Sequence, residues 1–135
     1  PALGHSNFKI EDGTMEFGVG HHGEAGTKVE KLKSASEMAQ EMAETILNDF
    51  DFEEGKEVAV MLSSLGATPV MELYVLYDEV EKVLAKAGHK VWKTYIGNYV
   101  TSLDMNGASL TIVDLDDEIK ELLSEPAVPI GMKNY

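Results

Sequence analysis

Two adjacent histidines, His21 and His22, stand in the glycine-rich stretch GVGHHGEAG at residues 18–26, and Glu24 follows them closely. An imidazole nitrogen can act as a nucleophile, a general base or a metal ligand. Glycine lets other groups approach the backbone closely, and loops on a rigid scaffold often carry chemistry. From the residues alone, a functional histidine and a solvated surface loop are both open interpretations.

Two other interpretations of this stretch are weaker. The letters GVGHHG match the G-x-G-x-x-G pattern of a dinucleotide-binding turn, but that turn must open a helix. Here Glu24-Ala25-Gly26 brings another glycine and no apolar periodicity. A metal site needs three or four converging ligands, and neighbours on an extended chain point in opposite directions. We therefore expect no nucleotide and no metal at this stretch.

Two further polar stretches could contribute to a site. LSSLGATP, residues 62–69, links a buried strand to a helix, which is where open α/β sheets bind ligands. It also fits a plain turn with Thr68 as the N-cap and Pro69 at the first helical position. No GKS or GKT follows, which excludes a P-loop. GNYVTSLDM, residues 97–105, is either a polar pocket wall or a turn anchored by an aromatic side chain.

Hydrophobic periodicity predicts an alternation of strands and helices. Ser34 and Glu37 form a capping box at the start of one helix, and Gly88 is placed to end another. We expect Val70, Leu73, Tyr74, Tyr77, Val80 and Leu84 to line the buried face of that second helix. The expected strands are 14–19, 58–62, 89–96 and 108–115, and the expected helices are 34–48, 69–87 and 116–123. This order predicts one α/β domain over residues 1–135 with a mixed sheet.

The composition narrows the function classes. The 135 residues carry a formal net charge of −13, which disfavours binding to nucleic acid. No apolar run approaches the roughly 20 residues that span a bilayer, and no export signal opens the chain. Cysteine is absent, so disulfide and thiol chemistry are excluded. We expect a cytoplasmic protein that binds neither a membrane nor nucleic acid.

Three motifs in this order resemble one family, the dihydroxyacetone kinases. TMEFGVGHHGEAG resembles a segment that in this family usually reads MEMGVGIHGEPG. LSSLGATPVMELY resembles its N-x-L-G-A-T-P-x-x-E-L-Y segment, and GNYVTSLDMNGASLTIVDLDDE resembles its G-x-Y-x-T-S-L-D-M-x-G-x-S-x-T-L segment. The resemblance covers nearly the whole chain and corresponds to the C-terminal half of the family's dihydroxyacetone-binding subunit.

The resemblance implies a site and a fold. His22 matches the histidine that holds the ketose covalently as a hemiaminal, and Gly20, Gly23 and Glu24 would adjoin the bound substrate. An imidazole nitrogen adds to a carbonyl carbon, so this capture selects short-chain ketoses over polyols. The implied fold is a two-layer α/β domain with a mixed sheet of about six strands and helices packed on it.

Some positions depart from the family's pattern. His21 stands where isoleucine is common, Ala25 stands where proline is common, and Ser63 and Ser64 replace asparagines. These departures bear on which ketose is bound and on whether the domain serves catalysis. A ketose-sensing regulator of the same fold, a co-activator without kinase activity, is the alternative function.

The resemblance also implies partners. The family's N-terminal domain, which supplies further ketose contacts, has no counterpart in these residues. ATP, or ADP with Mg²⁺, would be carried by a nucleotide-binding kinase domain or subunit and not by this domain. The full subunit is expected to form a homodimer. This chain alone is therefore expected to lack kinase activity.

Overall fold

The computed structural model describes residues 4–5, 9–22, 24–53 and 55–132. Its main sheet has three strands in the order β4-β3-β5, and a separate two-stranded sheet pairs β1 with β2. The strands are β1 (Thr14–Phe17), β2 (Lys28–Lys31), β3 (Glu57–Ser64), β4 (Lys90–Gly97) and β5 (Ala108–Asp114), and the helices are α1 (Ala35–Asp49), α2 (Val70–Lys86) and α3 (Asp117–Ser124).

The main sheet is mixed. β3 runs parallel to β4, with a register shift between Val58 and Ala59, and antiparallel to β5 without a shift. Val58, Val60 and Leu62 alternate along β3 and are fully buried, so one face of the sheet supplies the centre of the core. β3 is thus the central strand, and the segments that follow β3 and β4 meet at one edge of the sheet.

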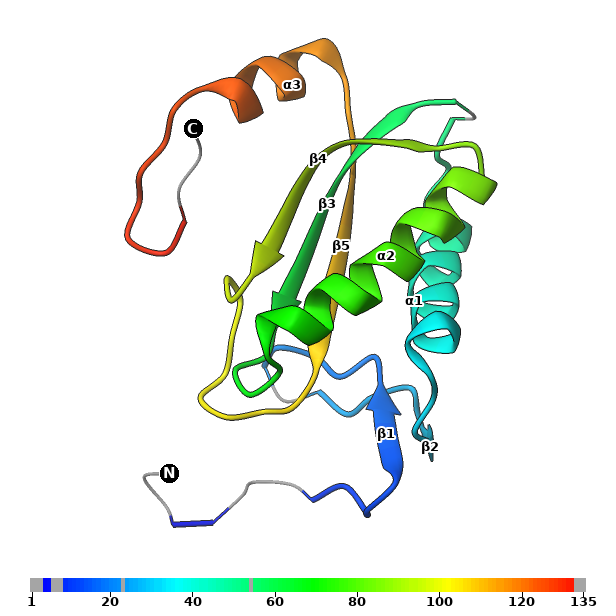
Figure 1. Cartoon of the computed structure of the whole chain (residues 1–135), viewed down its shortest axis with the longest axis vertical. Coiled ribbons are helices and arrows are strands. Elements are labelled where there is room, and N and C mark those ends of the chain that lie inside the picture. The colour runs from blue at the N-terminus through cyan, green and yellow to red at the C-terminus, as the bar shows by residue number, and fades with distance from the viewer. Residues whose placement is uncertain (1–3, 6–8, 23, 54, 133–135) are drawn as a thin grey trace.

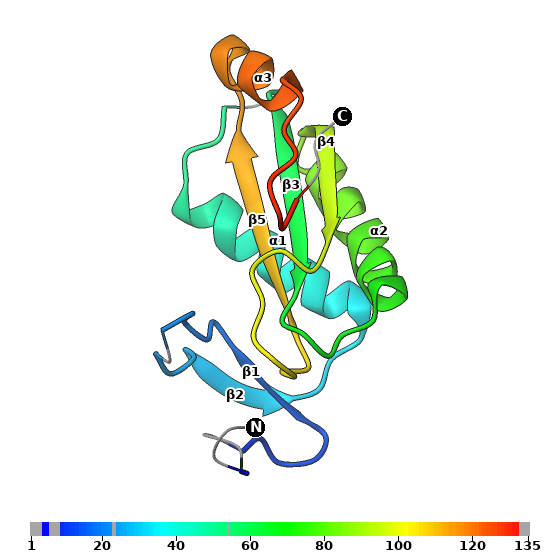
Figure 2. The same ribbon diagram turned by 90° about the vertical axis from the view of Figure 1, so that its left-hand side faces the viewer.

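α1 and α2 cover the same face of the main sheet (Figure 1). Ala39 of α1 and Leu73, Val80 and Leu84 of α2 are fully buried against β3. α3 lies at the opposite end of the sheet from the β1–β2 pair, and the C-terminal segment passes in front of the other face (Figure 2). The β1–β2 pair lies below the carboxyl ends of β3 and β4, where the candidate site was expected.

The prediction of one sheet with about six strands is wrong, although the α/β class and the mixed pairing are confirmed. Five strands form two sheets among the described residues. The expectation also missed β2, whose KVEK sequence has one apolar residue and high exposure. Four residues paired only with another short strand carry a weak periodic signal, since little of either face is buried.

The start of α2 also differs from the expectation. Pro69, and not Thr68, is the N-cap residue, and it makes no side-chain capping bond. The Thr68 hydroxyl is used instead by Gly107, whose N–H donates to it and whose carbonyl accepts from it, both at 2.8 Å. Two of the six residues expected on the buried face, Val70 and Tyr74, are exposed. Leu76, which was not among the six, is buried. Tertiary pairing with the 98–107 segment therefore overrides the local capping preference.

Candidate functional site

The loop that carries the two histidines joins β1 to β2, and its base is fixed by hydrogen bonds. The N–H of Thr27 donates to the carbonyl of Phe17 at 2.8 Å, and the N–H of Gly26 donates to the Glu16 carboxylate at 2.7 Å. A Cβ at Gly26 would lie 2.6 Å from the Phe17 carbonyl oxygen, so this position requires glycine. The base of the loop is therefore a defined turn and not an open coil.

His22 lies at the tip of this loop, and Glu24 holds it. Its side chain is 90% exposed, its backbone N–H donates to Glu24 Oε2 at 3.0 Å, and its Nδ1 lies 3.4 Å from Glu24 Oε1. Hydrogen bonds from the N–H groups of Glu24 and His22 lower the pKa of the Glu24 carboxyl. The carboxylate therefore stays ionised at neutral pH and orients an imidazole that faces solvent.

Gly20 is packed against the same carboxylate. Its N–H donates to the Glu24 carbonyl at 3.0 Å. A Cβ at position 20 would lie 2.0 Å from Glu24 Oε2 and 2.7 Å from Glu24 Cβ, so a larger residue would displace Glu24. Gly20, His22 and Glu24 thus lie in contact with one another, and their role beside a bound ketose stays a prediction. Gly23, the other expected contact, lies outside the described residues.

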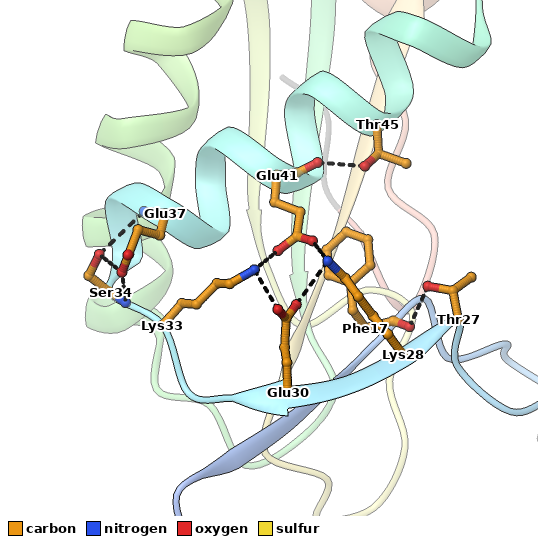
Figure 3. Close-up of polar contacts among 9 residues, drawn as sticks. All are labelled: Phe17, Thr27, Lys28, Glu30, Lys33, Ser34, Glu37, Glu41 and Thr45. Atoms are coloured by element: carbon orange, nitrogen blue, oxygen red, sulfur yellow. Dashed lines mark hydrogen bonds and ion pairs between the residues drawn. The ribbon is translucent and has the colours of Figure 1, made fainter.

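A cluster of four charged side chains fastens β2 to α1 (Figure 3). Glu41 of α1 accepts from both Lys28 and Lys33, and the same two lysines contact Glu30 at 3.1 and 2.8 Å. We call these residues the hairpin cluster. Lys28 and Glu30 have the i, i+2 spacing of one strand face, which could have indicated this cluster, but without β2 the signal was missed. The cluster therefore links β2, which follows the histidine loop, to α1.

Acidification is expected to loosen the hairpin cluster. Hydrogen bonds from Lys28 and Lys33 lower the pKa of Glu41 below its usual 4.5. A carboxyl with a lowered folded-state pKa stabilises the fold above its ordinary value, and that contribution is lost as pH falls through the lowered value. Glu41→Gln should therefore reduce the NMR order parameters of the β1–β2 amides already at neutral pH and weaken their further decrease below pH 4.5.

Glu44→Gln is the matched control, because Glu44 lies on the same helix and bonds to Gln40 instead of a lysine. It should leave the β1–β2 amides as ordered as in the wild type. Equal order parameters in the Glu41 and Glu44 variants would show that the cluster does not hold the hairpin. The midpoint of global unfolding should change little, because ion pairs that solvent still reaches contribute only weakly to stability.

The other two polar stretches, residues 62–69 and 97–105, are joined to each other by hydrogen bonds. The buried Ser63 hydroxyl accepts from the N–H groups of Tyr99 and Val100, both at 3.0 Å. The Ser102 hydroxyl donates to the Leu65 carbonyl at 2.7 Å. These hydroxyls are occupied by backbone partners. For both stretches this favours the interpretation as a turn, over a ligand site at residues 62–69 and over a polar pocket wall at residues 97–105.

The structure does not bring these two stretches and the histidine loop into one pocket. A hollow of about 900 Å³ lies beside α1 and β5 and includes no residue of the loop. Within the described ranges, no three acidic, histidine or cysteine side chains gather as a metal site. No helix in the same ranges is long and apolar enough to cross a membrane. The histidine loop is therefore an open, pre-shaped surface.

The fold and the loop together define a class: an α/β domain that presents a carboxylate-held histidine beside the carboxyl edge of its sheet. Comparison with known proteins shows the family. The sequence matches the Dak1 domain family over residues 1–130, and the chain belongs to it.

Relatives and solved structures agree with this assignment. The chain is 37% identical over 126 residues to the dihydroxyacetone-binding subunit DhaK of the PTS-dependent dihydroxyacetone kinase 2 of Listeria innocua, covering 93% of this chain and 38% of that protein. It therefore spans less than two fifths of that relative's length. The solved dihydroxyacetone kinase operon co-activator Dha-DhaQ has a TM-score of 0.84 at 30% identity, covering 90% of this chain and 38% of the other.

A third comparison concerns a kinase. The crystal structure of the dihydroxyacetone kinase from C. freundii in complex with AMP-PNP and Mg²⁺ has a TM-score of 0.74 at 28% identity. It covers 87% of this chain and 21% of that one. The family expected from the three motifs is confirmed. The roles of individual residues are not tested by these likenesses.

Proposed function

We propose that this domain is the ketose-capturing half of a dihydroxyacetone kinase subunit, with His22 as the covalent attachment point. The observation that carries the proposal is the pair His22–Glu24 at the tip of a fixed loop, with the imidazole facing solvent. An exposed ring is accessible to a carbonyl compound. The family membership supports a ketose as that compound.

The proposed chemistry is an addition that balances without a cofactor. With Nδ1–H directed at the Glu24 carboxylate, Nε2 carries the free lone pair. Nε2 bonds to the carbonyl carbon, and the C=O π pair moves to oxygen. The Nδ1 proton passes to Glu24 and from there, through solvent water, to that oxygen, so the carboxylate and the water are both restored. The product is a neutral hemiaminal, nothing is oxidised, and no water is released.

Phosphoryl transfer is assigned to partners. We propose that ATP, or ADP with Mg²⁺, is held by a nucleotide-binding domain or subunit, and that further ketose contacts come from an N-terminal domain. The relatives extend well beyond the matched region, which leaves room for such parts. This chain alone is then inactive as a kinase, and the full subunit is a cytoplasmic homodimer.

Dihydroxyacetone labelled with ¹³C at its carbonyl carbon tests the capture step. On addition of the chain, we expect a new signal in the tetrahedral range of the ¹³C spectrum, because the carbonyl carbon becomes sp³. Equally labelled glycerol should give no new signal, since an alcohol offers the imidazole no electrophile. Absence of a new signal at saturating dihydroxyacetone would refute capture by this domain.

The alternative function is a ketose-sensing co-activator. The TM-score of 0.84 to the co-activator Dha-DhaQ exceeds the 0.74 to the C. freundii kinase. Both functions use the same capture step, so the ¹³C experiment does not separate them. Incubating the intact subunit with ketose and a nucleotide-binding kinase subunit does, because phosphorylated ketose is expected from a kinase and not from a co-activator.

A further inference from the structure

Glu16 lies on the face of the β1–β2 hairpin that is turned away from the hairpin cluster. The ladder pairs Phe17 with Lys28 and Glu16 with Val29. Paired residues share a face and neighbours along a strand alternate, so Lys28 and Glu16 project to opposite faces. The Glu16 carboxylate is therefore placed for a different use from that of the acids that bind Lys28.

Glu16 binds the histidine loop just beyond the last pair of the ladder. Gly26 lies two residues before β2 begins, outside the register that ends with Phe17 and Lys28. Its N–H donates to Glu16 Oε1 at 2.7 Å, and this part-buried bond joins positions ten residues apart. A part-buried N–H is costly to leave unpaired. The Glu16 side chain thus closes the loop where the strand ladder has ended.

Glu16 and Gly26 are also in close contact. A Cβ at position 26 would lie 2.6 Å from Glu16 Cγ. Gly20 and Glu24 make a similar pair further along the loop, since a Cβ at position 20 would lie 2.7 Å from Glu24 Cβ. Two contacts between a glutamate and a glycine therefore close the loop, one at its base and one at its tip.

The contact at the base is connected to the contact at the tip by a short piece of chain. A single residue, Ala25, separates Gly26 from Glu24. Neither Ala25 nor Gly26 has a ring or a branched side chain that would restrain the backbone torsions. The placement of Glu24 therefore depends on the bond that anchors Gly26 to Glu16. His22 depends in turn on Glu24, through the contacts at 3.0 and 3.4 Å.

We propose that Glu16 is a positioning residue of the histidine loop, which acts on His22 through Gly26 and Glu24. Glu16 itself does not touch the ketose. It holds Glu24 where the carboxylate faces Nδ1 of His22, so that Nε2 keeps the free lone pair. The part of this inference that concerns ketose capture rests on the proposed function, whereas the orientation of the imidazole is measurable without a ketose.

Glu16→Ala and Glu16→Gln test the role of the hydrogen bond. Alanine removes the acceptor, whereas the side-chain carbonyl of glutamine still accepts from an N–H. In Glu16→Ala we expect faster hydrogen exchange of the Gly26 amide and a mixture of His22 tautomers in the ¹⁵N spectrum. Formation of the ¹³C adduct should slow about tenfold, less than the roughly hundredfold cost of a 1 Å misplacement, because the Gly20 N–H still binds the Glu24 carbonyl.

The conservative variant decides between a hydrogen bond and a charge. Glu16→Gln should restore the Gly26 exchange rate, the His22 tautomer and the adduct rate to near wild-type values, because it keeps the acceptor and removes only the charge. The tautomer is measured in mildly alkaline solution, where imidazole side chains are neutral. Equal losses in Glu16→Gln and Glu16→Ala would overturn the proposal.

Glu11→Ala is the matched control. Glu11 is an acid that precedes β1, but it holds Thr14 through its backbone carbonyl, which accepts from the Thr14 N–H at 3.0 Å and from the hydroxyl at 2.7 Å. Its side chain can be removed without breaking these bonds, so all three measurements should stay at wild-type values. The same changes in Glu11→Ala as in Glu16→Ala would assign the effect to lost negative charge and refute the proposal.

Gly26→Ala tests the route by which Glu16 acts. The added Cβ would collide with Glu16 Cγ and with the Phe17 carbonyl oxygen, both at 2.6 Å, so it should disturb the His22 tautomer more than Glu16→Ala does. Adding Glu16→Ala to Gly26→Ala should then change the His22 ¹⁵N shifts no further, because the two residues act as one unit. Additive effects would contradict this route. Circular dichroism of each variant checks that the fold is intact.

The measurements without ketose separate this inference from the proposed function. If the wild type forms no adduct and Glu16→Ala still mixes the His22 tautomers, the proposed function fails and the positioning role stands. If the wild type forms the adduct and Glu16→Ala changes neither the tautomer nor the adduct rate, capture stands and the positioning role is refuted.

Discussion

His22→Ala is expected to abolish the ¹³C adduct signal with dihydroxyacetone, while His21→Ala leaves it at wild-type intensity. The two histidines are adjacent on one loop, so both variants remove the same ring from nearly the same place. Only His22 is held by Glu24, through its backbone N–H at 3.0 Å and its Nδ1 at 3.4 Å. The measurement is the intensity of the tetrahedral carbon signal at saturating ketose.

A conservative variant of Glu24 separates the orientation of the His22 imidazole from its role as the point of covalent attachment. Glu24→Gln keeps the size of the side chain but removes the carboxylate that accepts from Nδ1, so the adduct should form more slowly and the two imidazole tautomers should become mixed. ¹⁵N shifts of His22 report the tautomer without any ketose present. Loss of the adduct in the His21 variant, with retention in the His22 variant, would reassign the nucleophile. Loss of the adduct in both variants would show that adduct formation depends on the integrity of the loop and not on the His22 imidazole.

The histidine loop could be recognised from the sequence, but the hairpin cluster beside it could not. The motif around His22 resembles a family segment, and the glycines on either side predict close backbone approach. Glu41, by contrast, reaches Lys28 and Lys33 across two elements. A strand of four residues with one apolar side chain gives almost no periodic signal, so neither β2 nor this cross-element cluster could be read locally.

The start of a helix was predicted correctly from the sequence where a single N-cap residue determines it. The capping box of Ser34 and Glu37 is present, and Asp116 accepts from the N–H of Ile119 at the start of α3. The same reasoning failed at Thr68, because its hydroxyl has a stronger use in joining two loops that lie far apart in sequence. The prediction of the number of strands failed for a related reason, since the extent of a sheet depends on which strand edges pair with another strand.

Gly66→Ala is expected to destabilise the domain by about 3 kcal/mol or more. Gly66 has φ +125°, a conformation that residues with a side chain rarely adopt. A Cβ there would lie 2.8 Å from the Ser102 carbonyl oxygen, which is backbone and cannot rotate away. Relief requires the segment after β4 to move, which would stretch the bonds that Ser102 makes to the Leu65 carbonyl at 3.1 and 2.7 Å. Urea denaturation measures the loss as a lower midpoint at unchanged slope.

Gly55→Ala is the matched control for this variant. Gly55 has φ +80°, also in the left-handed region, but a Cβ at that position meets nothing within 4 Å. Its cost is the conformational strain alone, about 1 kcal/mol. The difference between the two variants therefore isolates the collision that ties the turn after β3 to the segment after β4. If both alanines lower stability equally, these two stretches are not rigidly joined, and the carboxyl edge of the sheet is free to rearrange around a ligand.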